Sequence, residues 1–296
     1  MTRIDSDKGD FLYGLFDEKI RSFLFYLDKA KKTYQIEDIH QLRVNTKRIN
    51  AVYQLLESAT ALRFKAQSHL KPIKDIFKSA GKLREGQVNL ELLKLYKLHP
   101  DPFMFYNINL EKSQVRTIRE LKKAIRGFDK IAFDHTIKIV EDYCSQIDKT
   151  TLIDKMDEYI QHKAKLIKEL LGEKQNPKNV HKIRKHLKSI DPVLSLLCLN
   201  QPERFNSISI ESLKESAIYI GDFHDRVILL KSIERLVKDH KDTRLPPASR
   251  TGRAGQERKK VEQAFDELVK LIQEDINNLV EKINTTLNVT LKHIIH

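Results

Sequence analysis

The sequence predicts an all-α fold that is built from a duplicated four-helix unit. Three observations predict it. Apolar residues recur at helical spacing along nearly the whole 296-residue chain. Glycine and proline are scarce, at 9 and 8 residues, which argues against a fold with many tight turns. One helical motif also occurs twice, about 140 residues apart.

The first half of the chain contains four predicted helices, because apolar side chains return there every three or four positions. They cover residues 11–34, 39–57, 68–98 and 110–147. The third is expected to bend at Gly81. Residues 107–110, together with Pro100 and Pro102 before them, are expected to separate the third helix from the fourth, since prolines commonly follow helix ends.

The second half has the same number of predicted helices. They cover residues 152–171, 180–199, 208–240 and 253–291, and the first of them is expected to stop at Gly172. Residues 243–255 are predicted to form a loop between the last two. Its helix-breaking and basic residues are Pro246, Pro247, Gly252, Gly255, Arg244, Arg250 and Arg253.

Two matching segments indicate the duplication. Residues 39–47 and 180–188 share the pattern apolar-His-x-apolar-Arg-x-x-x-Lys at an offset of 141 residues. Residues 81–88 align with residues 221–228 at an offset of 140. Because two ordered matches at nearly one offset are hard to obtain by chance, we predict two units, residues 1–150 and 151–296.

The repeated motif places cations on one face of each helix. His40, Arg43 and Lys47 fall within about 60° of one another on a helical wheel, Arg48 lies about 80° away, and apolar residues fill the opposite side. The sixth predicted helix repeats this face with four residues: His181, Arg184, Lys185 and Lys188.

The helix starts are expected to strengthen these faces. Asp38 and Asn179 are plausible N-caps, which would place both histidines in a first turn, beside free N–H groups and the positive end of the helix dipole. A solvated basic face is the ordinary alternative. Solvent, however, does not require a histidine and an arginine at the same two places in both halves, so we favour an anion-binding surface.

Further basic stripes extend the predicted surface along neighbouring helices. They consist of Lys74, Lys78, Lys82, Arg116, Arg119, Lys123 and Arg126 in the first half, and Arg258 and Lys259 in the second. The second half is weaker in cations, because Glu211, Ile218 and Asp222 stand where the first half has lysines. The wheel places Arg84 on the apolar side, where an ion pair is the expected role. Gly81 and Gly221 are expected to allow close packing or a kink.

Composition limits the function classes. Lys and Arg number 54 against 41 Asp and Glu, giving a net charge of +13 and a pI of about 9.5, which favours a polyanionic partner. Cys144 and Cys198 lack a CxxC spacing, so we expect reduced structural thiols. No signal peptide and no apolar run of membrane-spanning length is found, so a cytoplasmic protein without membrane contact is expected. We find no P-loop, metal-ligand cluster or catalytic triad pattern, so we expect binding without catalysis, cofactor or metal.

The paired motifs resemble the CHAD family, the conserved-histidine α-helical domains, over nearly the whole chain. The resemblance implies one CHAD domain made of two four-helix bundles, related by a pseudo-twofold, with basic faces lining a central cleft. It also implies binding of inorganic polyphosphate, often at cytoplasmic granules. The chain departs from the family pattern at three positions: Ser189 in place of a second Arg48, Glu85 in place of aspartate, and His224 in place of a second arginine.

Nucleic acid remains the alternative partner. Proteins that bind single strands usually interleave aromatic residues for base stacking, and the basic stripes here contain none. That favours a bare phosphate chain, although RNA or DNA contacted through its backbone stays open. A membrane-facing basic surface is a minor option without interfacial Trp. The sequence leaves the oligomeric state open.

Overall fold

The computed structural model describes residues 10–60, 63–96, 100–173, 177–200, 207–242 and 253–294. Within these ranges it contains helices and no strand, so the predicted all-α class is confirmed. The elements are α1 (Asp10–Thr33), α2 (Ile36–Ala59), α3 (Ala66–His69), α4 (Lys71–Leu93), the 3₁₀ turn η1 (Lys94–Tyr96), α5 (Pro100–Arg126), α6 (Lys130–Gln146), α7 (Lys149–Gly172), α8 (Pro177–Asn200), α9 (Ser207–Asp242) and α10 (Arg253–Ile294).

The predicted fourth helix is two helices in the structure. The break lies at residues 127–129, where the Asp129 side chain caps α6 by accepting a 2.9 Å hydrogen bond from the backbone N–H of Ala132. At the other end, α5 already begins at Pro100 and runs through the predicted separator. Proline is tolerated in a first helical turn because the N–H that it lacks would have no partner there, so Pro100 begins a helix and does not mark the end of one.

Other helix boundaries also differ between the prediction and the structure. The predicted third helix is α4 flanked by the short elements α3 and η1, and α4 itself continues through Gly81. The last predicted helix begins at residue 253, and so does α10. Arg253 and Gly255, which the predicted loop also included, therefore belong to the first turn of that helix. Residues 243–252 of that loop, including Arg244 and Arg250, lie outside the described residues.

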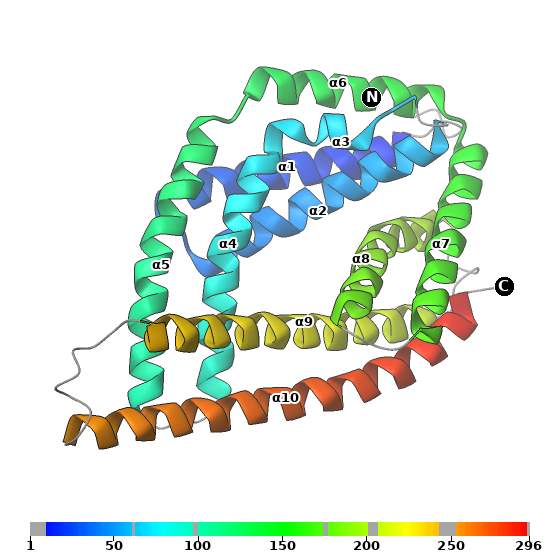
Figure 1. Cartoon of the computed structure of the whole chain (residues 1–296). Helices are drawn as coiled ribbons and strands as arrows, with labels where there is room; N and C mark the ends of the chain where they lie inside the picture. Colours follow the sequence, from blue (N-terminus) through cyan, green and yellow to red (C-terminus); the bar gives the residue numbers. More distant parts are fainter. Residues whose placement is uncertain are drawn as a thin grey trace.

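The helices pack in the same order in both halves of the chain (Figure 1). In the first half α1 packs on α2, α2 on α4 and α4 on α5, and in the second half α7 packs on α8, α8 on α9 and α9 on α10. The last helix of each half also packs on the first helix of that half: α6 packs on α1, and α10 packs on α7. A duplicated unit would give this order, although the duplication itself remains a prediction.

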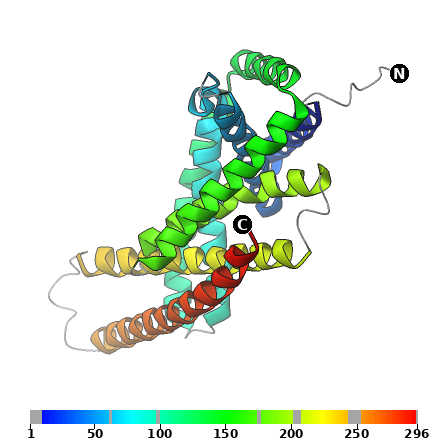
Figure 2. The same cartoon turned by 90° about the vertical axis from the view of Figure 1, so that its right-hand side faces the viewer.

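The hydrophobic core crosses the predicted boundary between the halves. Its main cluster joins residues such as Phe16 of α1, Ile167 of α7 and Leu287 of α10, all fully buried. A smaller cluster joins Leu93 and other first-half residues to α9 and α10, which pack on each other and cross the lower part of α4 in Figure 1. Figure 2 shows the same pair of helices turned by 90°. Because burial of such side chains contributes about 1.5–3 kcal/mol each, the shared core fixes the two halves against one another.

Two expectations from composition can be compared with this core. Cys144 is buried within the main cluster, Cys198 packs partly buried against it, and neither forms a disulfide, which agrees with structural thiols. None of the helices in the described ranges is long and apolar enough to cross a membrane.

Candidate anion-binding pocket

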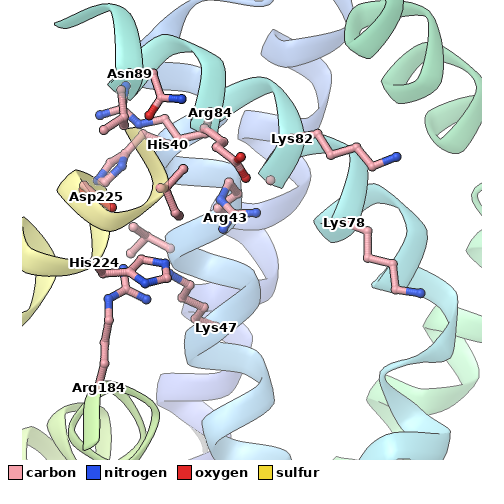
Figure 3. A pocket seen from close by; sticks show the side chains of 15 residues that line it. His40, Arg43, Lys47, Lys78, Lys82, Arg84, Asn89, Arg184, His224 and Asp225 are labelled. Atoms are coloured by element: carbon pink, nitrogen blue, oxygen red, sulfur yellow. The ribbon is translucent and has the colours of Figure 1, made fainter. Parts of the chain in front are cut away.

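A pocket of about 400 Å³ lies where the two halves meet, with walls from α2, α4, α8 and α9 (Figure 3). Its charged and polar lining consists of His40, Arg43, Lys47, Lys78, Lys82, Arg84, Glu85, Asn89, Arg184, His224 and Asp225. The lining thus includes six lysines and arginines and only two carboxylates, which makes this central pocket strongly basic.

Residues that occupy equivalent places in the two sequence motifs face this pocket together. Arg43 and Arg184 are such a pair at an offset of 141 residues, and Glu85 and Asp225 are another at 140. The two matching segments of the sequence therefore converge on one site. This is the arrangement expected near a pseudo-twofold axis.

Arg43 is held in place by α4. Its Nη1 donates a 2.9 Å hydrogen bond to the backbone carbonyl of Phe77, and its guanidinium lies 4.7 Å from the centre of the Phe77 ring. A Cβ at Gly81 would overlap Nη1 and lie 3.3 Å from Cζ, so only glycine leaves room for this side chain. Close packing therefore explains Gly81. It does not explain Gly221, where an added Cβ would meet nothing within 4 Å.

Two arginines of the pocket have guanidinium N–H groups that form no hydrogen bond with the part of the chain that the structure describes. Among the described residues, the buried Nε of Arg184 has no hydrogen-bond partner. Within the same residues, Nη1 of Arg84 makes an ion pair at 3.6 Å from Oε2 of Glu91 but no hydrogen bond. A buried donor without a partner costs about 1–3 kcal/mol, and more when it is charged, so both positions favour a bound anion.

The crowding of cations changes the acidity of the pocket residues. Desolvation, followed by the charges of Arg184 and Arg43, lowers the pKa of Lys47 to about 7. Desolvation and the charge of Arg184 likewise lower the pKa of Arg43. Burial raises the pKa of the Asp225 carboxyl, an effect that Arg184 opposes. The pocket therefore holds its positive charge at an electrostatic cost.

The histidines are predominantly uncharged in this environment. Burial and then Arg84 lower the pKa of His40, while burial and then Lys185 and Arg184 lower that of His181. Burial and Arg184 together lower the pKa of His224 to about 3. The rings of His181 and His224 lie 5.0 Å apart, and only His224 lines the pocket. His181 is therefore a neighbour of the pocket residue His224 and does not line the pocket itself.

The predicted helix caps are wrong. α2 begins at Ile36, so Asp38 lies inside its first turn, where its carboxylate accepts a 2.9 Å hydrogen bond from the Thr33 hydroxyl. Asn179 lies inside α8 and donates to Glu173 at 2.9 Å. Both histidines consequently lie beyond the first turn, and the pocket depends on side chains rather than on free N–H groups at helix ends.

A second hollow of about 700 Å³ lies between α4, α5 and α6 and contains Lys78, Lys82 and Lys123. Its charge is partly neutralised, because Glu120 forms ion pairs with Lys82 at 2.7 Å and with Arg116 at 3.3 Å. The other predicted residues line neither hollow: Arg48, Lys74, Arg116, Arg119, Arg126, His181, Lys185 and Lys188. The side chains of Arg258 and Lys259 lie outside the described part of the chain.

The sequence prediction missed several pocket residues. They are Arg84, Glu85, Asn89, His224 and Asp225. The second matching segment contained a signal for four of them, since it aligns Arg84-Glu85 with His224-Asp225. The expected ion pair of Arg84 exists, with Glu91, but the same side chain also faces the pocket. Among the described residues there is no group of three or more His, Cys, Asp or Glu that could hold a metal ion.

Comparisons with known proteins agree with this architecture. The model of the CHAD domain family matches residues 15–234. The crystal structure of the CHAD domain from the plant Ricinus communis is 13% identical, with a TM-score of 0.68 over 97% of this chain and 94% of that one. PptA from Streptomyces chartreusis is 13% identical, with a TM-score of 0.64 over 96% of this chain and 100% of that one. No curated protein matches in sequence. At these identities the two structures establish the fold alone.

Proposed function

Because this chain belongs to the CHAD domain family, we propose that it binds inorganic polyphosphate, without catalysis, in the central pocket between its two halves. The proposal includes a cytoplasmic location and association with polyphosphate granules, which the sequence resemblance implies. It treats the lysines and arginines of α2, α4 and α8 that line this pocket as the ligand-binding residues.

The proposal is supported most strongly by the excess of cations in the pocket and by a buried guanidinium N–H group that lacks an acceptor in the described part of the chain. Six lysines and arginines line the central pocket with only two carboxylates, and the buried Nε of Arg184 has no hydrogen-bond partner among the described residues. A phosphate chain carries negative charge and acceptor oxygens on every unit. It would therefore supply the missing acceptors and relieve the repulsion between the cations.

The chemistry of the lining favours a bare phosphate chain over nucleic acid. None of the described residues that line the pocket is Phe, Tyr or Trp, so the pocket offers no aromatic platform for bases. A nucleic acid contacted through its backbone is the second candidate. It would use the exposed cations of α5, such as Arg116 and Arg119, rather than the pocket.

A competition experiment at fixed salt tests the proposal. Labelled long-chain polyphosphate is challenged with RNA, duplex DNA, ATP and heparin, for the wild type, Arg184→Gln and Arg119→Gln. The two variants each remove one positive charge, the first inside the pocket and the second on the exposed surface. We expect Arg184→Gln to weaken polyphosphate binding about tenfold and Arg119→Gln to change it little.

Two results would contradict this function. Nucleic acid that competes as well as polyphosphate, charge for charge, would remove the specificity for a phosphate chain. Equal losses in the two variants would move the ligand from the pocket to the exposed surface.

A further inference from the structure

We infer that Lys47 is a modification site: acyl phosphates that enter the central pocket transfer their acyl group to its ε-amine. The inference rests on the proposed function in one respect, namely that phosphate groups enter this pocket. It adds a covalent reaction at a named atom, and with it a way to change the affinity of the pocket.

Lys47 is a half-buried lysine in the pocket wall, one helical turn after Arg43 on the same face of α2. Charged and titratable groups face it from every element around it: His40 and Arg43 of α2, Arg84 and Glu85 of α4, Arg184 and Lys188 of α8, and His224 and Asp225 of α9. Lys78 and Lys82 also line the pocket, but they are exposed and point away from this group (Figure 3). They are therefore internal controls for Lys47.

This environment favours the free amine, which is the nucleophilic form of lysine. An ammonium group that is withdrawn from water and placed beside other cations is destabilised, and enzymes activate lysines in this way. In the empty pocket the resulting pKa of about 7, against an ordinary value of 10.5, leaves a large share of Lys47 as free amine at pH 7. An ordinary lysine has only about one molecule in three thousand in that form at the same pH. A bound phosphate raises this pKa of Lys47 again, but burial, its largest cause, still holds it below that of an exposed lysine.

The same pocket can hold the phosphate of the reagent. Arg43 is fixed by the carbonyl of Phe77, and Arg184 has a buried N–H without a partner among the described residues. These two guanidinium groups have the largest lowering effects on the Lys47 amine among the charged neighbours. A phosphate bound between them therefore brings an attached acyl carbon close to the amine.

The reaction balances without a further reagent. The amine nitrogen attacks the carbonyl carbon, a C–N bond forms, and the bond between that carbon and the phosphate oxygen breaks. The departing phosphate takes up the amine proton and leaves as inorganic phosphate. The product is a neutral amide, so the pocket loses one group that could become a cation when a polyanion binds.

The experiment uses the intact protein and acetyl phosphate at pH 7. Peptide mass spectrometry follows acetylation of Lys47, Lys78 and Lys82 over time, with and without tripolyphosphate, and tripolyphosphate binding is measured on the same sample. We expect Lys47 to react at least tenfold faster than either exposed lysine, and tripolyphosphate to slow it at least fivefold. Acetic anhydride, which lacks a phosphate, is expected to show a smaller preference for Lys47.

The outcomes separate this inference from the proposed function. If tripolyphosphate binds but Lys47 reacts no faster than Lys78 and Lys82, the inference is overturned and the proposed function stands. If acetic anhydride shows the same preference as acetyl phosphate, the step guided by phosphate is overturned. Absence of tripolyphosphate binding would count against the proposed function itself.

Two variants test the consequence for binding. Lys47→Gln imitates the neutral acylated side chain, whereas Lys47→Arg keeps the charge and cannot be acylated under these conditions. We expect acetylated wild type and Lys47→Gln to bind tripolyphosphate about five- to tenfold more weakly, and Lys47→Arg to be insensitive to acetyl phosphate. An equal loss of affinity in treated Lys47→Arg would assign the effect to other lysines and overturn the inference.

Discussion

Replacing Gly81 with alanine tests the pocket without changing any charge. A Cβ at this position would overlap Nη1 of Arg43 and lie 3.3 Å from its Cζ. The clash is with the far end of a long side chain rather than with backbone, so α4 can remain intact while Arg43 withdraws. Arg43 then loses its hydrogen bond to the Phe77 carbonyl and its position over the Phe77 ring.

The expected energies follow from these contacts. Alanine in a helix interior is favoured over glycine by about 1 kcal/mol. Loss of the charged hydrogen bond costs about 1.5–3 kcal/mol, and loss of the cation–π contact about 0.5–1 kcal/mol. Gly81→Ala should therefore lower the free energy of unfolding by about 1–3 kcal/mol. Because one arginine of the pocket is no longer pre-positioned, we expect polyphosphate affinity to fall about tenfold, or about 1.4 kcal/mol.

Gly221→Ala is the matched control, because its added Cβ meets nothing within 4 Å and lies at the equivalent position of α9. It should gain about 0.5–1 kcal/mol of stability and bind like the wild type. Urea unfolding gives the stabilities, and titration with polyphosphate at several salt concentrations gives the affinities. The salt slope should be the same in all three proteins, since none has lost a charge. Wild-type affinity in Gly81→Ala would refute the argument that the docked position of Arg43 matters for binding.

Three further predictions concern charge and pH. Arg43→Ala combined with Arg184→Ala should weaken polyphosphate binding by about a hundredfold and leave the helical circular dichroism unchanged; a loss of helix signal would instead assign both residues a structural role. The logarithm of affinity should fall linearly with the logarithm of salt concentration, with a slope of about 3.5–5.6 for five to eight phosphates, and a flat response would point to an apolar ligand or a partner protein. Polyphosphate affinity should also fall as pH rises from about 7 to 9. Lys47 of the free pocket loses its proton near its pKa of about 7, whereas the negative charge of bound phosphate raises this pKa and keeps Lys47 protonated. Without ligand, the free energy of unfolding should rise from about pH 7 to 9, since the unfolded chain still binds the Lys47 proton there and the folded chain does not. Lys47→Met should flatten the pH dependence of both affinity and stability in this range. His40→Gln with His181→Gln should change the pH dependence of affinity only below about pH 7.

The sequence by itself determined the helical class, most of the helices and the central pair of arginines. Helical periodicity is a local property, so it is readable from neighbouring residues. Arg43 and Arg184 were found because a motif repeated at a fixed offset needs no structure to be recognised. The ends of the helices were predicted less accurately than their existence. Pro100 begins α5, although a proline at that place is equally compatible with the end of a preceding helix.

Only the tertiary structure decided which cations share a site and how they behave there. A helical wheel gives directions around one axis, so it assigned Arg84 to the apolar side and grouped Arg119 with the ligand-binding cations. The pocket, however, is defined by four helices from both halves, and it includes Arg84 but not Arg119. The low pKa of Lys47 arises in the same way, because it depends on burial and on charges from α2 and α8 that only the packing of the two halves brings together.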